Sequence, residues 1–314
     1  MTTFKWFASL VLTATLTPTL QAEPHCPGNV ASLPFRLLIG YQIVVPVSIN
    51  HSGPYDFLLD TGTQITMVGP SLAAELHLNT TGAAVVAGAG FHQSASFTQL
   101  DLLEAGSHAV ANQKVLVYGL LNLRSVDPHV RGILGEDFLE HFDMLIDYAH
   151  KLLCFDDSAV MRAEIKGPHI ALVTPPQRAD GAPLPKLLII AARLSGETRP
   201  VRMVLDSGAN IPYLYNTSQR LVPQRTSFGG TSLVGSGADG DQKVFAALPP
   251  QQVKIGSLEL PSVTFLTLAY PKKDSPTFEF DGLLTMDLFR RVFISHADHF
   301  AVFEPRWEEW AVTG

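Results

Sequence analysis

The sequence has few charged residues and no cluster of basic ones. Asp, Glu, Lys and Arg make up 16% of the 314 residues, the formal net charge is −7, and Lys and Arg form no dense run. Proteins that hold nucleic acid by its phosphates need such basic clusters, so the sequence gives no support to a nucleic-acid partner. The 46% hydrophobic content is sufficient for a packed core, which argues against extensive disorder.

Metal-binding and nucleotide-binding patterns are also missing. The 11 histidines, among them His92, His108, His141 and His150, are scattered, and none makes the His-x-x-x-His spacing of a helical zinc site. The glycine-rich segments lack the Lys-Ser/Thr that follows in a phosphate-binding loop. We therefore expect no metal and no cofactor.

Only the N-terminus carries a long apolar run. Lys5 precedes an apolar stretch over residues 6–16, and the small residue Ala22 follows, which is typical of an export signal. We predict a signal peptide over residues 1–22 and a secreted or periplasmic mature protein that is not inserted in a membrane. Leu20 stands where a small residue is preferred, so an uncleaved N-terminal anchor stays open as an alternative.

The only two cysteines, Cys26 and Cys154, both fall in the predicted mature chain. An even count in an exported protein permits one disulfide between them. The alternative is a buried thiol at Cys154, which lies in the apolar run 152–155, with Cys26 on a flexible start. The sequence alone leaves both interpretations open.

Glycine and proline are frequent, with 24 and 22 residues, and they separate many short apolar runs. Alternating or continuous apolar runs between such turn residues predict an all-β protein with little helix. Short helices are expected at residues 70–76, at 137–142 and near 287–291.

The two halves of the chain repeat the same four sequence landmarks in the same order. A repeat of this kind indicates that one structural unit occurs twice. Polar and proline-rich segments between the halves place the boundary near residue 160, with an N-terminal lobe over 23–160 and a C-terminal lobe over 161–314. The matched pairs are residues 55–62 with 201–208, 85–90 with 233–238, 102–117 with 253–267, and 131–139 with 281–289.

The first landmark carries an acid at the end of a continuous apolar run, Asp60 in the first half and Asp206 in the second. A carboxylate at the end of a buried strand loses solvation energy unless hydrogen bonds or function compensate. Equivalent repeat positions suggest that the two acids face each other across a pseudo-twofold axis. Two carboxylates at close range cannot both ionise, so one keeps a proton and supplies an acid while the other supplies a base.

Small residues follow both acids. Gly62 and Gly208 lack a Cβ, which lets the two loops approach until the acids meet. Thr61 and Ser207 can offer hydroxyls across the junction. The alternative is that both triplets are ordinary turns at strand ends.

The segments 57–63 and 203–209 resemble the active-site signatures of pepsin-like and retropepsin-like aspartic proteases, and residues 132–135 match that family's apolar-apolar-Gly element. The resemblance covers nearly all of the mature chain. It implies a bilobal acid protease fold, with two duplicated barrel-like lobes, a peptide cleft between them, and Asp60 and Asp206 as the catalytic pair. It further implies an aspartic endopeptidase acting on peptide or protein substrates, and a monomer, since both acids lie in one chain.

Each half also has a glycine-rich segment, in the second landmark. The resemblance implies that these segments form flaps over the cleft, more like the two flaps of retroviral proteases than the single flap of pepsins. The alternative is a pair of flexible hairpin tips. The candidate substrate-binding residues are Val86, Gly88, Gly90, Phe91, Gly235 and Gly237.

Two positions depart from the family pattern. Thr285 stands where a glycine is usual, and Ala209 lacks the hydroxyl that Thr63 provides in the first half. Fewer donors to the charged form raise a carboxylate's pKa, so we expect activity at less acidic pH than pepsin. The departures leave open a catalytically silent peptide-binding protein on the same scaffold and, more remotely, a duplicated scaffold used for envelope structure or attachment.

Overall fold

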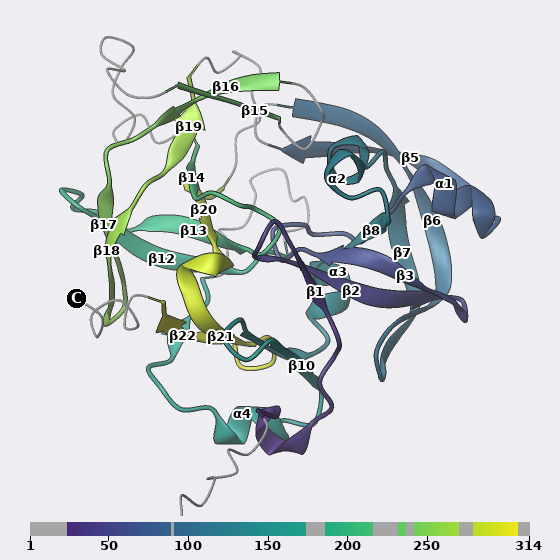
Figure 1. The fold of residues 1–314 in the computed structure, drawn as a ribbon, viewed down its shortest axis with the longest axis horizontal. Coiled ribbons are helices and arrows are strands. Elements are labelled where there is room, and N and C mark those ends of the chain that lie inside the picture. The colour runs from purple at the N-terminus through teal and green to yellow at the C-terminus, as the bar shows by residue number, and fades with distance from the viewer. Residues whose placement is uncertain are drawn as a thin grey trace, which may run out of the picture.

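The computed structural model describes residues 24–88, 91–173, 186–215, 232–236, 242–269 and 279–306. Within these residues the chain consists mainly of β-strands in three sheets (Figure 1), so the predicted all-β class is confirmed. The predicted signal peptide lies outside the described residues. None of the helices in the described segments is long and apolar enough to cross a membrane.

The first half of the chain forms an eight-stranded sheet, seen at the right of Figure 1. Its strands are β1 (Arg36–Leu38), β2 (Gln42–Ile49), β3 (Ser52–Leu59), β4 (Met67–Val68), β5 (Thr80–Gly88), β6 (Phe91–Ala105), β7 (His108–Val117) and β8 (Val130–Leu134). Their order is β1-β2-β3-β8-β4-β7-β6-β5. In its middle β3 runs parallel to β8, and β4 runs antiparallel to β8 and parallel to β7.

The second half forms a nine-stranded sheet with the same central pattern, at the left of Figure 1. Its strands are β12 (Ile189–Leu194), β13 (Val201–Asp206), β14 (Tyr213–Leu214), β15 (Ser232–Ser236), β16 (Gln242–Ala247), β17 (Gln251–Ile255), β18 (Leu258–Val263), β19 (Leu266–Leu268) and β20 (Gly282–Thr285). β13 runs parallel to β20, and β14 runs antiparallel to β20 and parallel to β19. In both halves the strand leading to the acid therefore lies beside the strand of the fourth landmark.

A third sheet of five strands takes strands from both halves and lies below the two large sheets in Figure 1. Its strands are β9 (Asp143–Asp147), β10 (Leu152–Asp156), β11 (Ile170–Ala171), β21 (Phe289–Ser295) and β22 (Phe300–Pro305). The halves meet where β9 pairs with β21, and the order is β10-β9-β21-β22-β11. The predicted boundary near residue 160 falls at the start of α4 (Val160–Glu164), between two strands of this shared sheet.

One buried hydrophobic cluster runs through both halves. It contains Ile43 and Phe57 from the first half and Met203 and Phe289 from the second, each completely or almost completely buried. Gly132 allows one of the closest contacts, because a Cβ there would lie 2.0 Å from the Phe57 ring. Burying a side chain of this size stabilises the fold by about 1.5–3 kcal/mol. The two halves therefore share a core.

The first two predicted helices are present. α1 (Pro70–Glu75) begins with a proline, whose missing N–H costs nothing in the first helical turn, and ends one residue before the predicted end. The helix predicted at 137–142 is α3 (Glu136–Leu139), which begins one residue earlier and is shorter.

The helix predicted near 287–291 is wrong. The chain forms only a 3₁₀ turn, η2 (Met286–Leu288), before β21 begins at Phe289. Phe289 and Val292 are completely buried, and β21 pairs on both sides in the shared sheet, so sheet formation overrides the local helix signal. A 3₁₀ turn η1 (Pro27–Asn29) and helices α2 (Leu121–Val126) and α4 were not predicted from the sequence.

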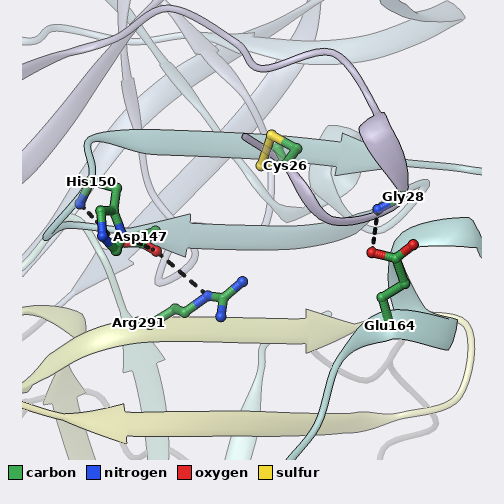
Figure 2. The surroundings of a disulfide bond; sticks show 7 residues. Cys26, Gly28, Asp147, His150, Glu164 and Arg291 are labelled. Carbon is green, nitrogen blue, oxygen red and sulfur yellow. Dashed lines mark hydrogen bonds and ion pairs between the residues drawn. A yellow bond between two sulfur atoms is a disulfide. The ribbon is translucent and has the colours of Figure 1, made fainter. Parts of the chain in front are cut away.

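Cys26 and Cys154 form a disulfide with a Cα–Cα distance of 6.0 Å (Figure 2). The bond joins the residue before η1 to β10 of the shared sheet, and both cysteines are buried among apolar side chains. The Gly28 amide donates a 2.8 Å hydrogen bond to the carboxylate of Glu164 in α4. The structure therefore attaches the N-terminal segment both to the shared sheet and to α4.

The disulfide gives the first testable prediction. The double variant C26S/C154S should lose about 2–5 kcal/mol of unfolding free energy, because the bond closes a long loop in the unfolded chain and removes conformational entropy from it. Denaturant unfolding with and without reductant measures the difference. Reductant should leave the double variant unchanged, and equal midpoints for the oxidised protein and the variant would contradict the prediction.

Candidate active site

The structure places Asp60 and Asp206 at equivalent ends of two parallel strand pairs. Asp60 follows β3, and its amide donates a 3.0 Å hydrogen bond to the Leu134 carbonyl at the end of β8. Asp206 ends β13 in register with Thr285 of β20. Both acids keep intermediate solvent exposure. The strand ends bring the two acids to the junction of the large sheets.

Each acid packs against the glycine that follows the other acid. A Cβ built on Gly62 would lie 2.5 Å from the Asp206 carboxyl carbon, and a Cβ on Gly208 would lie 2.5 Å from the carboxyl carbon of Asp60. Real Cβ atoms do not approach other atoms this closely, so only glycine fits at either position. The contacts are reciprocal, which puts the two carboxyl groups on a pseudo-twofold axis.

Thr61 and Ser207 connect the two loops by four hydrogen bonds across this axis. Each backbone amide donates to the hydroxyl of the other residue at 3.1 Å. The Thr61 hydroxyl donates to the Leu205 carbonyl at 2.7 Å, and the Ser207 hydroxyl donates to the Leu59 carbonyl at 2.8 Å. Both side chains are buried, so breaking this arrangement would leave unsatisfied polar groups.

The two acids receive different hydrogen bonds. Asp60 accepts from the Gly62 amide and from the Thr63 hydroxyl, each at 2.8 Å. Asp206 accepts from the backbone amides of Gly208 at 2.9 Å and Ala209 at 2.8 Å. Ala209, at the repeat position of Thr63, has no hydroxyl to donate.

Burial raises the pKa of both carboxyl groups. For Asp60 the Thr63 hydroxyl and the Gly62 amide partly offset that rise. For Asp206 the negative charge of Asp60 adds to the effect of burial, and the two backbone amides oppose it. Since hydrogen bonds to the ionised form favour ionisation, the donors around Asp60 favour its ionised form, and the charge of Asp60 favours a proton on Asp206.

The loop that follows Asp60 is also held by hydrogen bonds to α3 and to the residue before it. The Asp137 carboxylate accepts hydrogen bonds from the Thr66 amide at 2.8 Å and the Thr66 hydroxyl at 2.6 Å. The Thr66 hydroxyl in turn accepts from the Gly135 amide at 3.1 Å. A Cβ on Gly135 would come within 2.9 Å of the Thr63 carbonyl, so the loop lies directly on this glycine.

The second loop has different residues at some of these positions. Pro212 occupies the repeat position of Thr66 and can donate neither an amide nor a hydroxyl proton. Asp287 stands at the repeat position of Asp137, and its Oδ1 has no hydrogen-bond partner among the described residues. Thr285 stands at the repeat position of Gly135 and is completely buried. Its hydroxyl has no hydrogen-bond partner among the described residues.

The chain is similar to known aspartic proteases in part of its sequence and in its fold. The aspartyl protease family model matches residues 45–138, which include the first acid and its supporting loop. No curated protein matches the chain. An aspartic proteinase from Irpex lacteus is similar in structure at 13% sequence identity, covering 88% of this chain and 97% of that one, with a TM-score of 0.49. A retropepsin-like aspartic protease from Rickettsia conorii is 21% identical, covering 36% of this chain and 81% of that one, with a TM-score of 0.27.

Residues 45–138 of the chain therefore match the aspartyl protease family. The family model covers the first acid, and the second acid meets it in a matching loop. The match supports a protease function.

Both halves of the chain carry a hairpin at the predicted flap position. In the first, Val86 pairs with Gln93 and Gly88 with Phe91 between β5 and β6. In the second, Gly235 pairs with Lys243 between β15 and β16. The strands therefore exist in both halves, and contact with a substrate stays a prediction. Two of the predicted flap residues, Gly90 and Gly237, lie outside the described residues.

Sequence reasoning missed four side chains around the pair of acids. Gln42, at the start of β2, donates a hydrogen bond to the Gly208 carbonyl and so connects the first half to the second acid loop. Glu136 and His296 form a buried contact below the first loop. Asp137 also went unnoticed, although its recurrence as Asp287 in the fourth landmark was a usable signal.

The second prediction concerns the crossing glycines. The variants G62A and G208A should each lose about 10²-fold or more in kcat/KM, because the added methyl group must displace the opposite carboxyl group. Peptide cleavage assays and thermal unfolding together separate lost activity from lost folding. G119A is the matched control, since a Cβ there meets no atom within 4 Å. Full activity in G62A would contradict the observed packing.

Proposed function

We propose that this protein is an aspartic endopeptidase in which a water molecule, activated between Asp60 and Asp206, attacks a peptide carbonyl. The single observation that carries the proposal is the reciprocal packing of each acid on the glycine behind the other, which places the two carboxyl groups face to face. Acids so placed share one proton, and a pair with one base and one acid is what hydrolysis requires.

The difference between the two loops assigns the roles. Asp60, which accepts the Thr63 hydroxyl bond, acts as the ionised base and takes a proton from the water. Asp206 holds the proton and donates it to the carbonyl oxygen as the water oxygen bonds to the carbonyl carbon. The resulting gem-diol collapses when Asp60 returns its proton to the leaving nitrogen and Asp206 regains a proton from a hydroxyl. The peptide C–N bond breaks in this step, and both acids return to their starting states.

An extended peptide is the substrate that the fold favours. The hairpins β5–β6 and β15–β16 offer strands to which such a peptide can add by main-chain hydrogen bonds. Val85 and Val234 on these hairpins are 67% and 68% exposed, which suits contact with apolar side chains of a substrate. The proposed enzyme works as a monomer, since one chain supplies both acids, and the disulfide suits a secreted or periplasmic protein.

The first experiment is cleavage of a mixed peptide library between about pH 3 and about pH 7 by the wild type and by D60N, with and without a statine inhibitor. The wild type should cleave and be inhibited, and D60N should lose all measurable turnover because the base is gone. D101N is the matched control, since Asp101 is an exposed residue outside the site. Equal inactivity of wild type and D60N would reject the peptidase and favour a peptide-binding scaffold.

A second test uses the difference between Thr63 and Ala209. In A209T a hydroxyl becomes available to stabilise ionised Asp206, so its pKa falls and the alkaline limb of the kcat/KM profile moves to lower pH. One hydrogen bond of about 1 kcal/mol corresponds to a shift of about 0.5–1 pH unit.

T63A provides the complementary change. Loss of the hydroxyl raises the pKa of Asp60, so the acid limb of the profile should move to higher pH by a similar amount. Bell-shaped profiles measured on one substrate report both limbs. Profiles that coincide with the wild type in both variants would contradict the assignment of base and acid.

A further inference from the structure

A buried acid and a buried histidine from opposite halves meet below the first acid loop. Glu136 is 2% exposed and opens α3, directly after β8, while His296 is 8% exposed and follows β21 of the shared sheet. Their Oε2 and Nε2 atoms are 3.0 Å apart. The proposed hydrolysis uses neither side chain, and a buried charged group without a function costs stability.

The hydrogen bond between His296 and Phe142 shows which atoms of the contact carry protons. The Nδ1 atom of His296 lies 2.6 Å from the Phe142 carbonyl, and since a carbonyl only accepts, Nδ1 carries a hydrogen. One further proton then lies between Nε2 and the Glu136 carboxylate. The contact is a hydrogen bond whichever atom holds that proton, and it is lost when the proton leaves.

The pair keeps its proton to higher pH than a free histidine would. Burial alone lowers the pKa of His296, but the hydrogen bond and charge of Glu136 outweigh it and raise the pKa. Burial also raises the pKa of Glu136. The other charged groups around the pair are Glu140, Asp60, Asp143, and the Arg162 and Asp298 that form ion pairs beside Asp143.

Two short steps connect the pair to the first acid. The Glu136 amide donates a 2.8 Å hydrogen bond to the Thr63 carbonyl, and the Thr63 hydroxyl donates at 2.8 Å to Asp60. Loss of the histidine would therefore disturb Asp60 through Glu136 in two ways. Movement of α3 would weaken the Thr63 bond, and at any pH where Glu136 is ionised its unpaired charge would repel the Asp60 carboxylate. Both effects raise the pKa of Asp60.

The second half has a different residue at the position of Glu136. Met286 occupies the repeat position of Glu136 and is buried and apolar. Support by a buried ion pair therefore reaches only the acid that serves as the base.

We propose that His296 is a positioning residue for Asp60, which it holds in place by keeping the Glu136 carboxylate paired and neutralised across the two halves. It does not touch the substrate. The inference rests on the proposed peptidase function, because a defined base is needed only if Asp60 activates water.

The test compares H296L with the double variant E136L/H296L. In H296L the buried carboxylate is left without its partner, and kcat/KM should fall by about tenfold to about a hundredfold, with the acid limb of the pH profile moved to higher pH. The double variant has no charge left to pair, so it should recover most of the activity and the original acid limb. If H296L does not fold, H296Q, which keeps an N–H donor for Glu136 but no charge, takes its place with the same expected directions.

H150L is the matched control. His150 forms a histidine–carboxylate contact with Asp147 at 2.9 Å, but its side chain is 56% exposed (Figure 2). Water can replace this contact, so H150L should stay within about twofold of the wild type. Wild-type activity and pH profile in folded H296L, or a double variant as impaired as the single one, would overturn the proposal.

A measurement without turnover separates this proposal from the proposed function. Carboxyl ¹³C NMR of aspartate-labelled protein follows the titration of Asp60, assigned with D60N. The pKa of Asp60 should rise in H296L and return in the double variant. If the wild type cleaves no peptide, the peptidase proposal fails, and this titration still decides the other one, because an unchanged Asp60 titration in H296L would overturn it.

Discussion

The whole arrangement depends on one close approach, that of two carboxyl groups held at the ends of strands from different halves. The approach is possible only because Gly62 and Gly208 have no Cβ, and it is held by the reciprocal hydrogen bonds of Thr61 and Ser207. Two ionised carboxylates held this close would repel each other, so the arrangement favours one shared proton between Asp60 and Asp206. The parallel strand pairs and the shared sheet hold the two loops in that position.

The two acids are equivalent in position but not in support. The first loop has the Thr63 hydroxyl and, below it, the hydrogen bonds between Thr66 and Asp137. In the second loop Ala209 and Pro212 stand in place of Thr63 and Thr66, and Gln42 of the first half contacts the loop instead. Hydrogen bonds to a carboxylate stabilise its ionised form, so this difference favours ionisation of Asp60 over ionisation of Asp206.

The sequence predicted what local patterns determine. The paired acid motifs, the repeat and most of the strand character follow from short runs of residues, and the structure brings Asp60 and Asp206 together. The sequence could not predict the contact of Glu136 with His296, because the two residues lie far apart in the chain and neither was recognised as part of a motif. The failed helix near residue 287 has the same cause, since pairing of β21 in the shared sheet is a tertiary effect.

The shared sheet also limits how the site can open. Buried residues of both halves belong to one hydrophobic cluster, so moving the halves apart would expose apolar surface at about 25 cal/mol per Å². Phe293 of β21 pairs with Leu145 of β9 inside that junction, and both are buried. The hairpins β5–β6 and β15–β16 carry apolar side chains, Val85 and Val234, that are already exposed. Movement of the hairpins therefore exposes less new apolar surface than separation of the halves. It is the motion with the lower free-energy cost by which a peptide could reach the two acids.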